Sequence, residues 1–108
     1  MKLDIPESQV VKSCLHWLLI HGCYVWRNNT GAHQNEKTKS YIRYGLPGSA
    51  DIIGLTPSGK FIAIECKSAK GKLKYTQITF GNRILEKNGI YLVARSIDDL
   101  ERNKEKFI

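Results

Sequence analysis

The sequence predicts a mixed α/β fold, in which helices pack on a central β-sheet of parallel and antiparallel strands. Residues 52–55 and 60–66 are apolar runs separated by Thr-Pro-Ser-Gly, which is typical of a tight reversal, so we expect an antiparallel hairpin. A helical segment at 75–88 separates the second of these strands from another apolar run at 90–94. A helix between two strands makes a crossover, which predicts that those two strands are parallel.

The chain begins with an expected helix over residues 6–21, followed by a short strand at 23–26. Pro6 suits the first turn of this helix and Gly22 suits its end. Apolar residues recur every three or four positions, which indicates one buried face. They are Val10, Val11, Cys14, Leu15, Leu18 and Leu19.

Residues 28–47 are polar and rich in asparagine, glycine and lysine, with no apolar period visible outside 41–44. We therefore expect a long loop, which in a small domain is usually functional or mobile. The predicted order of elements along the chain is thus α-β-β-β-α-β-α.

The second half of the chain is expected to continue with a basic loop at 69–74 and the helix at 75–88. Gly89 is a suitable stop for that helix. Ser96 is placed to cap a last helix, with Asp98 and Asp99 in its first turn, where the helix dipole favours acids. Since this helix is mostly charged, we expect it to lie on the surface.

The composition is that of a single globular domain covering residues 1–108, with 42% hydrophobic and 25% charged residues. No apolar run is long enough to span a membrane, and the first residues do not resemble a signal peptide, so we expect a cytoplasmic protein with no membrane partner. The net charge of +7 favours a polyanionic partner such as nucleic acid. A solvated lysine-rich surface is the alternative.

Asp51, Glu65 and Lys67 form the most informative group of residues. Residues two apart on a strand share a face, so Glu65 and Lys67 should project together, opposite to Ile62 and Ile64. Charged groups beside a buried sheet face are costly unless they are paired or used. Such charged groups would have a use if the carboxylates bound a divalent cation that acts, together with the ammonium, on a phosphodiester.

We expect the oxygens of Asp51 and Glu65 to bind Mg²⁺ or Mn²⁺, with the backbone carbonyl of Cys66 as a third ligand. Lys67 would orient or polarise the attacking water. Glu7 lies on the apolar stripe of the first helix and could reach the metal directly or through a water. The structural alternatives are a turn-capping role for Asp51, an ion pair between Glu65 and Lys67, and a helix-dipole role for Glu7.

Other metal and nucleotide sites fit the sequence less well. Cys14, His16, His21 and Cys23 are close in sequence, but Cys14 and His16 would point about 200° apart on a helix, which disfavours a shared zinc. The three cysteines include no C-x-x-C pair and are expected to be free thiols. No G-x-x-x-x-G-K-[ST] motif is present, so we expect no nucleotide cofactor.

The ordered set of residues resembles the PD-(D/E)xK nuclease superfamily, and within it the virus-type replication-repair nuclease (VRR-NUC) domain in its standalone phage form. An E-x-K motif alone is unspecific, but the ordered set of motifs, with a hairpin between Asp51 and Glu65, is more specific. Nearly the whole chain is covered: Glu7, the stretch Tyr24–Asn29, Gly48-x-x-Asp51, Glu65-x-Lys67 and Gln77. The chain departs from the family at Ala50, where proline is frequent. Because proline only shapes the backbone there, we expect activity to be kept.

The resemblance implies a restriction-endonuclease-like core and a divalent-metal-dependent endonuclease acting on branched DNA. The implied active-site set is Glu7, Asp51, Glu65, Lys67 and Gln77, although Gln77 by itself would read as a surface residue. If a phage encodes the chain, the expected location is the host cell cytoplasm.

Basic residues near this set are expected to contact DNA phosphates, which position DNA without reading its sequence. One group follows Lys67 in the basic loop, and a second includes basic residues of the 28–47 segment, where Lys37, Lys39, Tyr41 and Tyr44 could contribute. The residues predicted to bind DNA are Lys70, Lys72, Lys74, Tyr75, Arg27 and Arg43.

A four-way (Holliday) junction is the expected substrate, cleaved by a homodimer. Resolution of a junction needs two related nicks, and a two-fold dimer supplies two sites in the right symmetry. The alternatives are the same fold acting on flaps, nicks or single strands, and a non-catalytic DNA-binding module.

Overall fold

The computed structural model describes residues 4–29 and 31–108, without the side chains of residues 32 and 33. Met1 to Leu3, which are part of the segment expected not to be a signal peptide, lie outside these ranges. Within these ranges, ten elements follow one another. They are α1 (Glu7–Ile20), β1 (Tyr24–Arg27), β2 (Gly31–Gln34), β3 (Tyr41–Tyr44), β4 (Ile52–Leu55), β5 (Phe61–Cys66), α2 (Tyr75–Glu86), β6 (Ile90–Ala94), α3 (Ile97–Arg102) and the 3₁₀ helix η1 (Lys104–Phe107).

The main sheet has four strands in the order β1-β4-β5-β6. β4 pairs antiparallel with both β1 and β5, whereas β5 pairs parallel with β6, with Ile64 opposite Leu92. The mixed sheet and the crossover through α2 are therefore confirmed. The hairpin between β4 and β5 is also confirmed, with a tight turn in which the Gly59 N–H donates to the Thr56 carbonyl oxygen.

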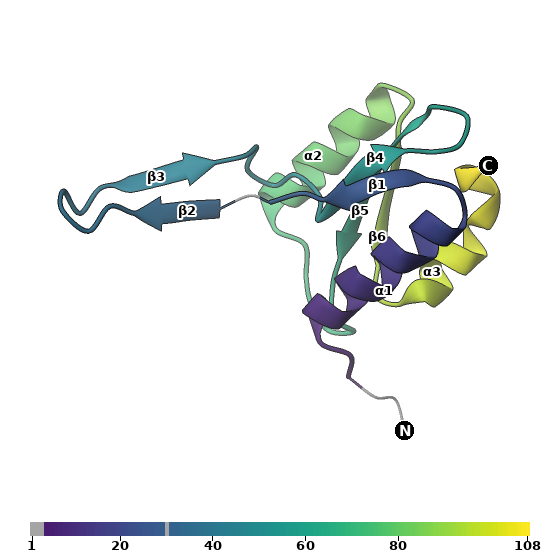
Figure 1. Ribbon diagram of the computed structural model, residues 1–108, viewed down its shortest axis with the longest axis horizontal. Helices are drawn as coiled ribbons and strands as arrows, with labels where there is room; N and C mark the ends of the chain where they lie inside the picture. Colours follow the sequence, from purple (N-terminus) through teal and green to yellow (C-terminus); the bar gives the residue numbers. More distant parts are fainter. Residues whose placement is uncertain (1–3, 30) are drawn as a thin grey trace.

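Helices cover both faces of this sheet (Figure 1). α1 and α3 lie on the face that presents Ile62 and Ile64, and they are joined where the Trp17 indole donates to Glu101 at 2.7 Å. α2 packs on the opposite face. A Cβ at Gly81 would come within 2.5 Å of the Tyr91 ring, so only glycine lets α2 approach β6 this closely.

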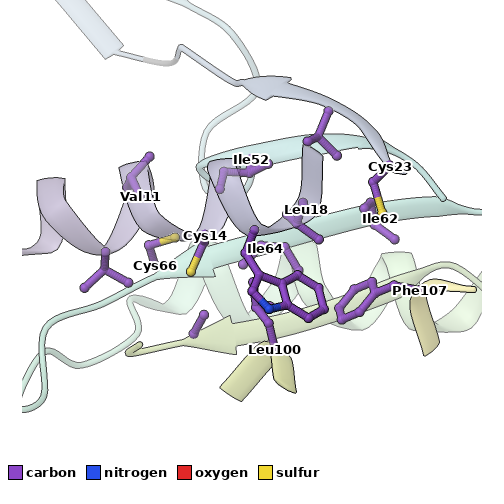
Figure 2. Close-up of a cluster of buried hydrophobic side chains, with 14 of the residues drawn as sticks. Val11, Cys14, Leu18, Cys23, Ile52, Ile62, Ile64, Cys66, Leu100 and Phe107 are labelled. Carbon is purple, nitrogen blue, oxygen red and sulfur yellow. The ribbon is translucent and has the colours of Figure 1, made fainter. Parts of the chain in front are cut away.

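The hydrophobic core fills the space between α1, α3 and the sheet (Figure 2). Its side chains are supplied by every element of this layer, including the two cysteines Cys14 and Cys66, which lie beside each other in Figure 2. A hydrogen bond with Cys14 and burial raise the pKa of the Cys66 thiol, so this thiol is a protonated core group. All three cysteines are free, as predicted.

The expected loop at 28–47 is corrected by the structure. β2 and β3 form a two-stranded antiparallel hairpin in this segment, with Gln34 opposite Tyr41 and Gly31 opposite Tyr44. The hairpin projects away from the main sheet (Figure 1), and all four residues of β3 are exposed. Because neither face of β3 is buried, the segment carries no alternation of apolar and polar residues that could reveal a strand.

Two further expectations on burial are corrected. Leu19 was expected on the buried stripe of α1 but is 48% exposed, whereas Trp17 is buried and packs edge-on against Phe107. The last helix is capped by Ser96 as predicted, but it is more than a surface element. Leu100 and Phe107 lie in the core, because the chain after β6 folds back onto α1.

No helix within the described residues is both long and apolar enough to cross a membrane.

Candidate metal centre and basic surface

An acidic cluster forms where the N-terminus of α1 meets the ends of β4 and β5. Glu7 is the first residue of α1, Asp51 immediately precedes β4, and Glu65 lies on β5. One carboxylate oxygen from each residue lies within 4.8 Å of the other two. Hard divalent cations take several carboxylate oxygens as ligands, so this cluster has the donor set for such an ion.

Glu65 is the central group of the acidic cluster. Its side chain is 2% exposed, and Oε1 has no hydrogen-bond partner among the residues that the structure describes. Oε2 accepts a hydrogen bond from the Gln77 amide at 3.4 Å and lies 3.8 Å from the Lys67 ammonium. A buried carboxylate oxygen that lacks a partner is costly, and a bound cation would satisfy it.

The electrostatics of Glu65 agree with such a role. Burial, together with the neighbouring carboxylates of Asp51 and Glu7, raises the pKa of Glu65 to about 8, although Lys67 acts in the opposite direction. Burial and the negative charges of Glu65 and Asp51 also raise the pKa of Tyr91 to about 12. The site therefore carries an excess of negative potential that a divalent cation would offset.

Lys67 follows Glu65 by two residues and, as the strand period predicts, projects on the same face. Its side chain is only 8% exposed, and its backbone N–H donates to the Ala94 carbonyl on the neighbouring strand β6. Gln77 reaches Glu65 from the first turn of α2, where its Oε1 also accepts from the Lys74 N–H at 2.8 Å. Gln77 is thus more than a surface residue, because it links the helix start to the acidic cluster.

Asp51 is held by two backbone contacts. Its Oδ2 accepts a hydrogen bond from the Cys66 N–H at 2.8 Å, and its carbonyl accepts from the Asn28 N–H at 2.7 Å. The Asn28 side chain also donates to Ser49 at 2.7 Å and to the Ala50 carbonyl at 3.0 Å. The ligand role of the Cys66 carbonyl stays a prediction.

Gly48 lets the segment before Asp51 pack against α2. Its φ is +80°, and a Cβ there would lie 2.3 Å from the Thr76 carbonyl oxygen. Any other residue would therefore be strained and would also collide with backbone. Glycine is therefore required at this position of the Gly48-x-x-Asp51 motif, because it allows the Asp51 segment to pack closely against the helix that carries Gln77.

The residues expected to contact DNA are exposed but lie in two regions. Lys70, Lys72, Lys74 and Tyr75 follow Lys67 directly along the chain, and Arg27 ends β1 next to Asn28. Arg43 lies instead on the projecting hairpin. The first group therefore lies on segments that adjoin residues of the acidic cluster along the chain, whereas Arg43 lies on the separate hairpin.

Asn28 and Arg95 are positioning residues that the sequence reasoning did not single out. The Arg95 guanidinium donates to the carbonyls of Ser68 at 2.6 Å and Gly71 at 2.7 Å, which holds the start of the basic loop. The sequence held a hint of this role for Arg95, because an arginine directly after a strand of the core needs a polar partner close to the adjacent strand. Which carbonyls it would meet depended on the tertiary fold.

The histidines and cysteines of the first helix do not gather around an ion site. His21 stacks on Trp17 with ring centroids 3.7 Å apart, His16 is exposed, and Cys14 and Cys23 lie in the core. Within the described part of the chain, the group of histidine, cysteine and acidic residues that could hold an ion is Glu7, Asp51 and Glu65.

Comparison with protein-family models, with curated proteins and with solved structures finds no match for this chain.

Proposed function

We propose that this chain is a divalent-metal-dependent endonuclease that hydrolyses phosphodiester bonds in branched DNA. The observation that carries the proposal is the acidic cluster of Glu7, Asp51 and Glu65, with Lys67 beside Glu65. A structural ion pair would not need two further carboxylates within 4.8 Å, because added negative charge destabilises a buried carboxylate. The exposed lysines that follow Lys67 suit a phosphate backbone.

The proposed fold family is the restriction-endonuclease-like core, in the version found in VRR-NUC domains. The order of the residues along the chain supports this: Glu7 lies on the first helix, Asp51 before the hairpin, Glu65 on its second strand, and Lys67 directly after that strand. Gln77 at the start of the following helix completes the set. Four strands in a mixed sheet between helical layers are compatible with such a core.

The proposed cofactor is Mg²⁺ or Mn²⁺, held by the carboxylates of Asp51 and Glu65, with Glu7 as a direct or water-mediated ligand. Such an ion would supply positive charge to the phosphate and lower the pKa of a bound water. The unpartnered Oε1 of Glu65 and the oxygen-only donor set fit a hard cation.

The protein's own groups would prepare the reaction by holding these ligands. The Gln77 amide donates to one oxygen of Glu65, and the Cys66 N–H donates to one oxygen of Asp51. These hydrogen bonds fix the orientation of the two carboxylates. Lys67 orients or polarises the attacking water and offers its charge to the phosphate. The exposed lysines of the basic loop hold the adjoining phosphates, and Arg95 keeps that loop in place.

We propose a homodimer as the active form on a four-way junction. A candidate contact surface is the half of the sheet that α2 leaves uncovered, within the part of the chain that the structure describes. On that face, β1, β4 and β5 present a row of exposed apolar side chains: Tyr24, Trp26, Leu55 and Phe61. Sedimentation equilibrium of wild type and Trp26→Glu tests this, and a monomeric wild type would contradict the dimer.

The test of the activity is cleavage of a synthetic four-way junction beside matched duplex, flap and single strand. Reactions contain Mg²⁺, Mn²⁺ or EDTA, with wild type, Lys67→Ala and Asp51→Asn. We expect paired nicks on the junction that disappear with EDTA and with both variants, while DNA binding survives. Lys60→Ala is the matched control, since Lys60 is exposed and precedes the opposite end of β5.

The other outcomes are equally informative. Metal-dependent cleavage of flaps or single strands would keep the chemistry and replace the substrate. Binding without cleavage under any metal would favour a non-catalytic DNA-binding module. Binding should also weaken with salt, with a log–log slope of about −0.9 per neutralised phosphate, and a flat dependence would contradict the proposed basic surface.

A further inference from the structure

A pocket of about 200 Å³ lies between the chain that leaves the hairpin and the first turns of α2. Its wall is largely apolar and aromatic, with hydroxyls and one guanidinium at intervals. The lining includes Leu46, Pro47, Tyr75, Thr79, Phe80 and Arg83. Leu46 is 63% exposed and Tyr75 is 82% exposed, so these large side chains do not belong to the hydrophobic core.

The pocket is built on the same two segments that carry the acidic cluster. One wall, Leu46 and Pro47, leads within a few residues to Asp51, and the other wall begins two residues before Gln77. The close approach of Gly48 to the Thr76 carbonyl fixes these walls against each other. The chain leaving β3 passes the start of α2 in Figure 1. The pocket and the proposed cleavage site are therefore built on the same two segments of the chain.

The lining indicates a flat aromatic ligand with polar edges. Tyr75 and Phe80 offer ring surfaces, while the Thr79 hydroxyl and the Arg83 guanidinium offer hydrogen bonds. Pockets for drug-sized ligands usually measure about 300–1,000 Å³, so this one suits a single small ring system. Lys72 and Lys74 precede Tyr75, which places positive charge next to the aromatic wall. A ligand that consists of one aromatic ring system with polar edges, attached to an anionic backbone, would fit both the pocket and the adjoining positive charge.

We propose that this pocket takes one unpaired nucleobase of the DNA branch, next to the bond that is cut. The inference rests on the proposed nuclease function and names the feature by which its substrate is selected. A base in a duplex cannot enter, because its faces are stacked and its edge is paired. Stacking on an aromatic side chain tolerates any base. The pocket would thus select branched DNA by structure and not by sequence.

The test uses DNA with one 5-iodouracil, a photoreactive base that crosslinks to aromatic side chains on irradiation. The base is placed either unpaired beside a branch or paired within an arm, and Lys67→Ala protein is used so that the DNA stays intact. We expect crosslinks to Tyr75 or Phe80, mapped by mass spectrometry, from the unpaired base only.

Two variants and a control accompany the crosslinking. Tyr75→Ala removes one ring that is largely exposed, and Thr79→Trp fills the pocket, so each should lower the affinity for unpaired-base DNA by roughly tenfold. Fully paired DNA should bind to the Thr79→Trp protein as it does to wild type. Leu85→Ala on the same helix removes an exposed apolar side chain outside the pocket and should change neither affinity.

Failure of this inference and failure of the nuclease proposal give different results. DNA that is bound and cut, but crosslinks elsewhere or equally when paired, overturns the pocket and leaves the nuclease. A protein that neither binds nor cuts DNA overturns both. If Tyr75→Ala dissociates a dimer and leaves DNA affinity unchanged, the pocket belongs to a protein interface, and the inference is wrong.

Discussion

Glu65 and Tyr41 lie in the two regions of this molecule that differ most. Glu65 is 2% exposed and is surrounded by side chains from α1, α2 and the segment before β4, whereas Tyr41 is 69% exposed on a hairpin that projects from the body (Figure 1). The acidic cluster has fixed partners from distant parts of the chain. The hairpin is held by its own strand pairing.

This difference indicates how the two regions can act. A metal centre requires several atoms within a few ångströms, and only a packed core fixes backbones that well. A long polyanion can be contacted by an exposed ribbon, because backbone phosphates repeat along it and demand little precision. Under the proposed function, the acidic cluster would carry the chemistry and the hairpin would contribute to binding, where Arg43 was expected to act.

The largest expected effect is a difference in folding stability between substitutions in the core and substitutions on the hairpin. Leu18→Ala removes a fully buried core side chain and should lower the free energy of unfolding by about 2–5 kcal/mol. Ile42→Ala, on the exposed hairpin, should change it by less than about 0.5 kcal/mol. Urea unfolding measures both. A large loss for Ile42→Ala would show that the hairpin is packed against something in solution.

Gly48→Ala tests the approach of the Asp51 segment to α2. A positive φ in a residue other than glycine costs about 1–3 kcal/mol, and the contact with the Thr76 carbonyl adds to this. We expect a lower melting temperature and a loss of cleavage. Gly59→Ala is the control, because Gly59 has a similar φ but open space around it. Equal effects of the two substitutions would show that strain matters and the close approach does not.

The pKa of Glu65 predicts a pH dependence of stability. A carboxyl whose pKa rises from 4.5 when unfolded to about 8 when folded stabilises the metal-free protein at low pH, and this contribution is lost as pH rises through about 8. In EDTA, Glu65→Gln should therefore become progressively more stable than wild type between these pH values. Thermal unfolding at several pH values measures this. A difference that stays constant with pH would contradict the raised pKa.

Addition of Mg²⁺ or Mn²⁺ sharpens the same measurement. Protons compete with the metal for carboxylates, so the metal should raise the melting temperature of wild type more at high pH than at low pH. Glu65→Gln should respond little. An equal response of the two proteins would place the bound ion elsewhere.

The smallest effect concerns Arg95. Arg95→Ala frees the carbonyls of Ser68 and Gly71, and the basic loop should then become more mobile. We expect a few-fold loss of DNA affinity with the salt dependence unchanged, since no phosphate contact is removed. Arg102→Ala, an exposed arginine of α3, is the control. A reduced salt slope would show that Arg95 itself contacts DNA.

Most of the main sheet could be predicted because its signals are local. The runs at 52–55 and 90–94 are bounded by turn residues, and both matched the observed strands. The shared face of Glu65 and Lys67 follows from the period of a strand, which needs no knowledge of the fold. The hairpin at 31–44 escaped prediction because β3 is exposed on both faces, which removes that period.

Local patterns in the sequence were enough to predict the helices and strands of the main sheet layer, the parallel crossover, and the shared face of Glu65 and Lys67. The packing of the elements against one another places Glu7 within 4.8 Å of Asp51 and Glu65, buries Trp17 in place of Leu19, and lets Arg95 hold the basic loop. Periodicity acts within one element, so it is readable in a short window of sequence. Contacts between residues far apart in the chain depend on how whole elements pack, and no local pattern encodes them.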